Sequence, residues 1–323
     1  MTGEENSELS LPPRSNAPQR WDATVAEAKY YWYDLLVNDP PVADFRDPIG
    51  RYQRRMQFAL DATMEKRLLY LLVARERLRI DVKKGTSWGF FGLKLSVPIL
   101  IGKDERKHSL QIELTVPFEA TFKKPQVTLH DKYLALNWGS MTEVFSVHDL
   151  IQQFDTGLSF PSKVLMVGQT RDPAAKLAKG RHTAVNRACE EVEAESDCFL
   201  LIKRMKVAVD TAATDWSEEA SMRTHVDVLE AMLIRHFEGE KPRGRSIIDQ
   251  STRAERLLTL IDTYQLESLI IDLGFKGADG FHDLVSEHAA KSRRHLLDCA
   301  FEDGEISIKP LPDDFRPLVE LEE

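Results

Sequence analysis

Residues 93–99 read LKLSVPI and residues 112–118 read IELTVPF, and these two similar stretches decide how the middle of the chain is interpreted. Apolar side chains stand at every second position through the first stretch and its flanks, residues 91–101, and again through residues 110–122. Alternation with a period of two is typical of a β-strand that buries one face. The sequence therefore predicts two strands here.

The loop between these strands, GKDERKHS at residues 102–109, is polar and charged, which favours a hairpin connection. Pairing about the middle of this loop places Val97 opposite Leu114 and Leu95 opposite Val116. Both apolar sets then lie on the same side of the ribbon. We expect that side of the hairpin to cover a core.

The likeness of the two stretches has a structural explanation. The similarity does not extend beyond these seven residues, and the chain contains no repeat of greater length. Pro98 and Pro117 would lie on the wetter face, where each removes a hydrogen-bond donor toward an outer neighbour and limits further strand addition. We therefore interpret the pair as two arms of one hairpin, and a duplicated functional element is the less favoured alternative.

Three further segments have strand character and are separated by short turns. They read PQVTLHDKYLALNW at residues 125–138, TEVFSV at residues 142–147 and KVLMVG at residues 163–168. Strands joined by such turns pair most simply with their neighbours in the chain. The sequence predicts an antiparallel meander of five or six strands.

Helical periodicity is the interpretation for most of the remaining chain. Residues 21–37 predict an N-terminal helix, and residues 50–84 predict a long one with apolar side chains at three- and four-residue steps. Five more helices are expected at residues 173–195, 199–212, 216–237, 252–273 and 281–301, with a last strand, EISIKP, at residues 305–310. The predicted fold class is α+β, with a helical N-terminal arm, an antiparallel β meander packed by the long helix, and a helical C-terminal half.

The same pattern divides the chain into four regions. We expect a disordered tail at residues 1–20, a helix plus antiparallel sheet domain at 21–168, a mainly helical region at 169–308, and an acidic tail at 309–323. The polar first twenty residues lack the apolar core of a secretory signal.

Composition excludes several classes of protein. A hydrophobic fraction of 42% with 29% charged residues is ordinary for a globular chain of 323 residues. No stretch approaches the roughly 18 apolar residues that a membrane helix needs, so no membrane partner is expected. Three cysteines, Cys189, Cys198 and Cys299, suit reduced thiols and predict a cytoplasmic location.

Motifs that carry catalytic chemistry are incomplete. His295 and Cys299 have the four-residue spacing of metal ligands on a helix, but neither HExxH nor paired CxxC occurs. The glycines of GFKGADG, residues 274–280, match neither a P-loop nor a dinucleotide fingerprint, and GFFG at residues 89–92 is interpreted as a flexible strand entry. We predict no catalytic residues, no metal and no cofactor.

A local excess of positive charge is the main functional signal. Residues 51–84 hold ten basic and four acidic side chains, although the whole chain has a formal net charge of −9. On a continuous helix, Arg54 and Arg55 would lie about 30 Å from Arg75, Arg77 and Arg79, a span comparable to one turn of duplex. Together with the basic loop at residues 241–245, the predicted nucleic-acid-binding residues are Arg51, Arg54, Arg55, Arg75, Arg79, Lys241, Arg243 and Arg245. The competing interpretation pairs these arginines with the protein's own acids.

Three functional hypotheses follow. The preferred one is a non-catalytic binding or assembly protein of the cytosol with a protein partner, associated with nucleic acid through the basic helix. The alternative is a nuclease-like hydrolase of phosphodiesters, with a site assembled from distant residues. A third hypothesis is that a sheet face binds a partner chain or apolar ligand, which an exposed cluster of Trp88, Phe90 and Leu100 would indicate.

Overall fold

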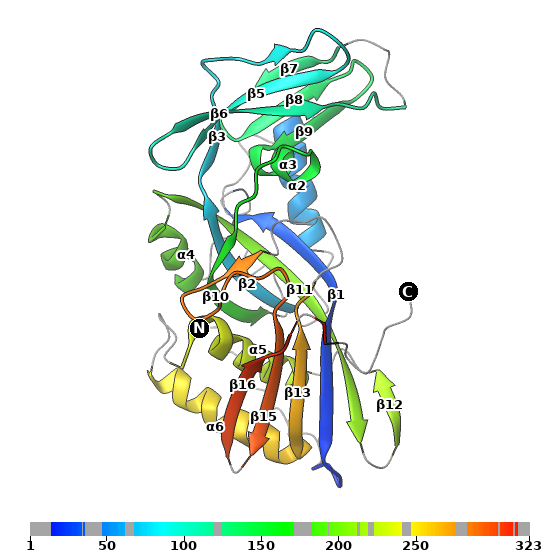
Figure 1. Cartoon of the computed structure of the whole chain (residues 1–323), viewed down its shortest axis with the longest axis vertical. Helices are drawn as coiled ribbons and strands as arrows, with labels where there is room; N and C mark the ends of the chain where they lie inside the picture. Colours follow the sequence, from blue (N-terminus) through cyan, green and yellow to red (C-terminus); the bar gives the residue numbers. More distant parts are fainter. Residues whose placement is uncertain are drawn as a thin grey trace, which may run out of the picture.

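A computed structural model describes most of the chain. The described residues are 14–33, 35, 47–61, 68–118, 124–170, 183–192, 194–211, 214–218, 223–240, 247–274, 283–302, 304–312, 314 and 315. Most of the predicted N-terminal tail and most of the acidic tail therefore lie outside the described residues. Among the described residues, more lie in strands than in helices. The molecule is elongated, with one large sheet below two small ones (Figure 1).

The large sheet, in the order β14-β10-β2-β11-β1-β13-β15-β16, forms the body of the protein. β12 pairs with β11 beside this path. All neighbours are antiparallel except β1 with β13 and β10 with β14. The strands are β1 (Gln19–Trp32), β2 (Leu68–Glu76), β10 (Ser162–Thr170), β11 (Ser196–Thr211), β12 (Thr214–Glu218), β13 (Leu266–Asp272), β14 (Leu284–Val285), β15 (Leu296–Glu302) and β16 (Glu305–Pro310).

The two small sheets, with two helices, form what we call the distal lobe, which comprises residues 47–61, 77–118 and 124–154. The first sheet pairs β3 (Leu78–Ile80), β4 (Ser87–Trp88) and β6 (Arg106–Glu113) with β5 (Lys94–Ile101), and the second is β7 (Gln126–Leu129), β8 (Tyr133–Asn137) and β9 (Thr142–Ser146). The helices of the lobe are α2 (Pro48–Asp61) and α3 (Val147–Gln153). The body carries α4 (Thr183–Glu190), α5 (Arg223–Glu238) and α6 (Ile247–Tyr264).

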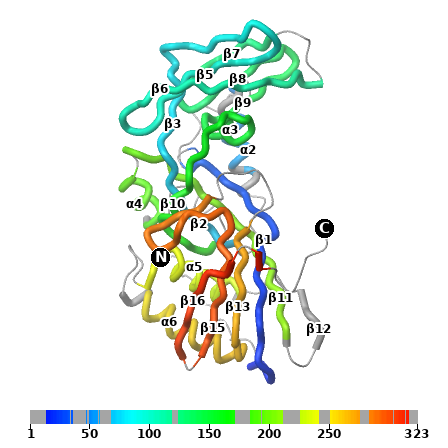
Figure 2. Tube along the Cα trace, in the orientation of Figure 1, coloured from blue at the N-terminus to red at the C-terminus, as the bar shows by residue number. Residues whose placement is uncertain are grey.

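The predicted helical N-terminal arm is wrong, because residues 21–32 belong to β1. Figure 2 shows β1 running between β11 and β13, which come from distant parts of the chain. Trp21, Ala23 and Trp32 are buried in the core that these strands share. β11 pairs along β1 from Gln19 to Trp32, and β13 pairs with its first part, Gln19 to Thr24. The hydrogen bonds and burial gained in this way outweigh the local preference of the segment for a helix.

The predicted long helix is also wrong. Its first part is α2, which ends at Asp61, but residues 68–76 form β2, a strand between β10 and β11. Leu69, Leu71 and Val73 belong to one apolar cluster, whereas the alternate side chains of the strand belong to a second cluster on the other face. The sequence of a strand that is buried on both faces is a continuous run of apolar residues. Periodicity alone does not distinguish such a run from a buried helix.

The predicted helical C-terminal half is also wrong, because strands alternate with helices in this region. Residues 199–211 lie in β11, and the predicted helices at 252–273 and 281–301 end in β13 and β15. α5 covers most of the helix predicted at 216–237, whose first residues lie in β12, and the strand predicted at 305–310 is confirmed as β16. α5 and α6 pack on one face of the large sheet, whereas α4 packs on the other face through Val185 and Cys189.

The predicted hairpin is confirmed, but its register is not. Val97 lies opposite Leu110, and Leu95 lies opposite Ile112. The turn is tighter than expected, since residues 106–109 continue the strand and Gly102 begins the turn at a φ of 74°. The shift is by an even number of residues, so the apolar sets still share one face.

The strands of the predicted meander divide among three sheets, with the hairpin strands β5 and β6 in one of them. β7, β8 and β9 form a three-stranded antiparallel sheet, whereas the segment KVLMVG lies in β10 and joins the body beside β2. β5, β6 and β8 place their buried side chains in the same apolar cluster as β1, β2 and α5. The core of the distal lobe is therefore continuous with that of the body.

Candidate functional site

The predicted basic residues do not form one exposed surface. Arg51 and Arg55 on α2 are exposed, and Arg54 is half-buried. Arg75 in β2 is only 3% exposed, because the chain after α2 returns as a central strand. Arg79 in β3 is directed into the protein. Lys241, Arg243 and Arg245 lie outside the described residues.

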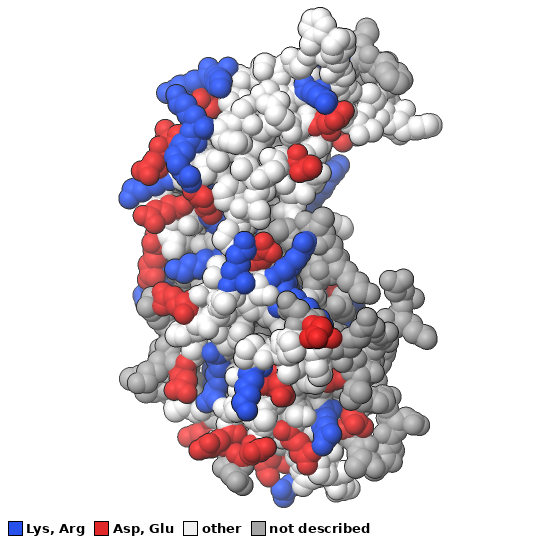
Figure 3. All heavy atoms as spheres, in the orientation of Figure 1, with Lys and Arg blue, Asp and Glu red and all other residues white. Residues whose placement is uncertain are grey.

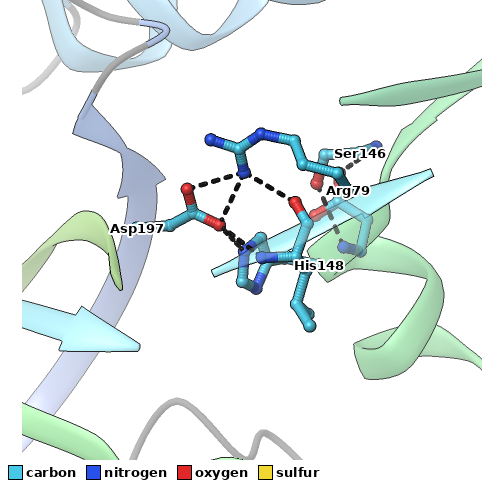
Figure 4. A network of polar contacts seen from close by, with 6 residues as sticks. Arg79, Ser146, His148 and Asp197 are labelled. Carbon is cyan, nitrogen blue, oxygen red and sulfur yellow. Dashed lines mark hydrogen bonds and ion pairs between the residues drawn. The ribbon is translucent and has the colours of Figure 1, made fainter. Parts of the chain in front are cut away.

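Arg79 belongs to a buried polar network at the junction of lobe and body (Figure 4). Its Nη1 donates to Asp197 Oδ1 at 2.8 Å and to the carbonyl oxygen of Leu78 at 2.6 Å. The backbone N–H of Leu78 donates to Asp197 Oδ2 at 3.0 Å, and His148 Nε2 lies 2.8 Å from the same oxygen. One carboxylate of β11 thus connects β3 and α3 of the lobe to the body.

Burial and pairing act against each other at this carboxylate. Burial alone would raise the pKa of Asp197, but the hydrogen bond from His148 and the charge of Arg79 bring that pKa below its ordinary value. Burial lowers the pKa of His148, although Asp197 opposes this effect. A neutral His148 then donates its Nε2 proton to an ionised Asp197.

A second part of the junction fixes α3. Ser146 Oγ accepts from the N–H of Asp149 at 3.0 Å, and Asp149 Oδ2 accepts from the N–H of Ser146 at 2.9 Å, which is a capping box. The hydroxyls of Tyr52 and Tyr30 donate to the same carboxylate at 2.5 and 3.3 Å. Asp149 therefore joins α3 to α2 and to β1.

The His148–Asp197 pair resembles a catalytic dyad in composition, but its surroundings indicate a structural role. Both side chains are 1% exposed. The edge of the Trp32 ring packs against His148, with ring centroids 4.9 Å apart, and the Trp32 and Phe199 rings stack at 5.7 Å. A substrate would have no access to a pair enclosed in this way, so we interpret it as a joint between lobe and body.

The far end of the distal lobe presents three phenylalanines to solvent. Phe90 is 92% exposed, Phe91 is 80% exposed and Phe118 is 104% exposed. Phe90 and Phe91 occupy the β4–β5 turn, which closes with the N–H of Gly89 donating to the carbonyl of Lys94 at 2.7 Å. Their rings meet edge to face with centroids 4.8 Å apart.

Phe118 follows the end of β6 that lies beside the start of β5. Beyond β6, the N–H of Leu114 donates to the carbonyl of Leu93 at 3.0 Å, so the outgoing chain lies beside the start of β5. Phe118 follows four residues later. We call Phe90, Phe91 and Phe118 the aromatic end of the lobe. Exposed aromatic rings of this kind are platforms on which bases or partner side chains stack.

The charge of the lobe differs in sign from that of the whole protein. Residues 47–61, 77–118 and 124–154 hold 13 basic and 9 acidic side chains, against a formal net charge of −9 for the chain. Figure 3 shows Lys and Arg side chains along one edge of the lobe. The exposed basic residues of the first small sheet and its loops are Lys83, Lys84, Lys94, Lys103, Arg106 and Lys107.

Several of these cations have acidic neighbours. Lys94 lies 3.8 Å from Glu113, with both side chains mostly exposed, and Lys103 lies 3.8 Å from Glu195. Exposed pairs at this distance are weak and are screened by salt. Lys124 Nζ lies 5.2 Å from the centre of the Trp88 ring, near the aromatic end. A polyanion could therefore displace these contacts at little cost.

Sequence reasoning found this surface only in part. The exposure of Phe90 agrees with the third hypothesis, but Trp88 and Leu100 are half-buried. Phe91 and Phe118 were expected on the buried face, where their strand periodicity would place them. The glycines on both sides of the Phe90–Phe91 pair are the signal of a turn: Gly92 has a φ of 70°.

Comparison with protein-family models, with curated proteins and with solved structures gives no match. Among the helices that the structure describes, none combines the length and the apolar character needed to cross a bilayer. In the same residues, no three His, Cys, Asp or Glu side chains come together in a group that could hold a metal ion.

Proposed function

We propose that this protein is a non-catalytic nucleic-acid-binding protein, and that its distal lobe holds a single strand against Phe90, Phe91 and Phe118. The observation that carries this proposal is the almost complete exposure of the three rings at one end of a positively charged lobe. Proteins that bind single strands combine such stacking platforms with basic surfaces that follow the backbone. This proposal moves the expected contact surface from a long basic helix to the end of two small sheets.

Charge separation within the molecule supports a polyanionic partner. The lobe is net positive although the chain is net negative, so the rest of the protein repels a nucleic acid that the lobe attracts. A bound strand would then be oriented with its phosphates toward the lysines of the lobe. Lys94, next to the β4–β5 turn, is the cation closest in sequence to Phe91.

The proposal also includes a cytosolic location. The three cysteines, all among the described residues, form no disulfide, and each is buried. Reduced thiols in a packed core suit a reducing compartment, where disulfides are rare. Burial also raises the pKa of Cys299 to about 12, so this thiol stays protonated and unreactive at neutral pH.

The test is fluorescence anisotropy with a labelled 20-nucleotide oligothymidylate and a labelled duplex over a series of salt concentrations. The test variant carries Phe90→Ser, Phe91→Ser and Phe118→Ser. We expect it to lose at least about a hundredfold in affinity for the single strand, since each stacked ring contributes about 1–3 kcal/mol. Binding should weaken as salt is raised, because phosphate contacts release counterions.

Two control variants make the test specific. Phe58→Ser on α2 removes another exposed phenylalanine, which is 76% exposed, and should leave binding unchanged. Arg51→Glu with Arg55→Glu tests the α2 surface. No binding at low salt, or equal binding by the wild type and the triple variant, would overturn the proposal.

Other outcomes point to the remaining hypotheses. Duplex binding that is lost only in the Arg51 and Arg55 variant would return the interface to α2. Cleavage of the labelled strand during the titration would support the phosphodiesterase alternative. Capture of a protein by the wild type but not by the triple variant, without nucleic-acid binding, would make the aromatic end a protein-docking surface.

A further inference from the structure

β6 is an edge strand of the first small sheet. It pairs with all eight residues of β5, so β3 and β4 share the opposite edge of β5. No further strand of the described residues pairs with β6. β3 follows almost directly from β2 of the body, and the open edge of β6 therefore lies on the side of β5 away from this connection. Nothing in the proposed function uses this edge.

The ladder between β5 and β6 shows which backbone groups of β6 point outward. The N–H of Leu114 donates to the carbonyl of Leu93 at 3.0 Å, which makes these two residues a hydrogen-bonded pair. Hydrogen-bonded and non-hydrogen-bonded pairs alternate along an antiparallel ladder, and the β5–β6 register has no shift. The residues of β6 that direct their N–H and C=O groups to the open edge are therefore Lys107, Ser109, Gln111 and Glu113. These backbone groups have no hydrogen-bond partner among the described residues.

β6 lacks two of the features that usually protect an edge strand. It contains no proline and no bulge, and it is eight residues long. At the two ends of the large sheet, by contrast, β14 has only two residues and β16 ends in Pro310. Of these three edges, that of β6 offers the longest stretch of backbone to a further strand.

The order of charges along this edge is self-complementary. Lys107, near one end of β6, and Glu113, at the other end, are both exposed. Two copies of β6 can pair antiparallel with Leu110 opposite the partner's Leu110. Lys107 then lies opposite the partner's Glu113, and Ser109 lies opposite the partner's Gln111. A shift of two residues in either direction separates the opposite charges, so charge selects this register.

The same register satisfies the open backbone groups. The four outward residues of one copy meet the four outward residues of the other, and each then donates one hydrogen bond and accepts one across the contact. The two-fold axis passes between the two Leu110 residues and is perpendicular to the sheet. The apolar faces of both sheets therefore stay on the same side, as in a single continuous sheet.

We propose that this protein forms a symmetric dimer in which β6 of the distal lobe pairs antiparallel with β6 of a second copy. The first small sheet then continues from one lobe into the other by strand addition. Backbone hydrogen bonds supply the affinity, and the two Lys107–Glu113 pairs fix the register. Because one strand pair is smaller than a standard interface, the dimer should dissociate on dilution.

Sedimentation equilibrium of the full chain measures this association. The concentration range is about 5 µM to about 500 µM, which suits a weak dimer. We expect the average mass to rise from 36.9 kDa, the mass of one chain, toward twice that value. A mass that stays at the value of one chain over the whole range would overturn the proposal.

Gln111→Pro tests the edge itself. The N–H of Gln111 points outward, so proline preserves the β5–β6 ladder but removes a donor from each copy and sets its ring against the partner. This variant should stay monomeric over the whole range. Gln111→Ala is the matched control, since it loses the same side chain but keeps the N–H, and it should associate like the wild type. Association of a folded Gln111→Pro variant at wild-type strength would contradict the proposal.

Charge reversal tests the register without changing the backbone. Lys107→Glu and Glu113→Lys should each weaken self-association about tenfold, because like charges then face each other twice. Mixing the two single variants should restore association, since every reversed side chain meets its complement in the mixed dimer. If the mixture associates no better than either variant alone, this pairing is wrong. Circular dichroism checks that each variant is folded.

The dimer and the nucleic-acid surface can be tested independently. The triple variant of the aromatic end keeps β6 unchanged and should associate like the wild type. The dimer is measured as mass without any oligonucleotide, so failure of the proposed function leaves this result intact, and the converse also holds.

Discussion

His148 of the distal lobe and Asp197 of the central strand β11 are joined by a contact of 2.8 Å between Nε2 and Oδ2, and both side chains are buried. The Asp197 carboxylate also accepts hydrogen bonds from Arg79 Nη1 and from the backbone N–H of Leu78. Lobe and body therefore share one polar joint inside a continuous apolar core. The attachment of the aromatic end to the body depends on that joint.

Replacing Asp197 by Ala should lower the free energy of unfolding by about 3–5 kcal/mol, because the half-buried Arg79 guanidinium, the buried His148 ring and the backbone N–H of Leu78 would lose their acceptor. Urea denaturation measures this change. Glu195→Ala is the control, since its pair with Lys103 is exposed and contributes at most about 1 kcal/mol. Equal costs for the two variants would contradict the joint.

Stability should fall as the solution is acidified from pH 6.5 toward pH 4. Burial lowers the pKa of His148 and His295, and burial together with His295 lowers the pKa of His236 from 6.5 to about 4. Below pH 6.5 the unfolded chain binds more protons than the folded one. The contribution of these histidines to the free energy of unfolding is therefore fully present above pH 6.5 and is lost between pH 6.5 and 4.

His236→Gln isolates one of these groups. His236 Nε2 lies 3.0 Å from His295 Nδ1, and a glutamine amide could donate the same hydrogen bond without titrating. The variant should lose about 2–3 kcal/mol less stability than the wild type between pH 6.5 and pH 4. Urea midpoints measured across this range provide the comparison, and parallel curves would rule out the effect.

Gly168→Ala should destabilise the body by about 1–3 kcal/mol through overpacking. Gly168 lies opposite Tyr70 in the β10–β2 pair, and a Cβ at this position would overlap the buried Tyr70 ring. The penalty should shrink in a Tyr70→Leu background, where the ring is absent. A double-mutant cycle measured by urea denaturation gives this coupling, and additive costs would contradict it.

The aromatic end should contribute little to folding. Phe90→Ser and Phe118→Ser should each change the unfolding free energy by less than about 0.5 kcal/mol, as is usual for exposed sites. Phe199→Ala is the contrasting variant, since its ring is 1% exposed and its loss should cost about 3–5 kcal/mol. A large loss of thermal stability in the Phe90 or Phe118 variant would mean that these rings pack on the protein.

The predicted site residues show how far sequence reasoning reached. The glycines around Phe90 and Phe91 indicated a break in the strand, but not that both rings would remain in solvent. The sequence pattern predicted that Arg79 is one of the exposed charges of a basic helix. In the structure Arg79 pairs with Asp197, which belongs to a strand and stands 118 residues further along the chain. Local spacing carries no information about such partners.

The sequence by itself determined the elements whose pattern is local. Alternation at period two identified the β5–β6 hairpin and its buried face, and turn residues separated the strands of the second small sheet. Only the tertiary structure decided that β1, β2 and β11 are strands. Each of these segments gains its hydrogen bonds from neighbours distant in the chain, and β2 is buried on both faces, so its apolar run has no period that distinguishes a strand from a helix.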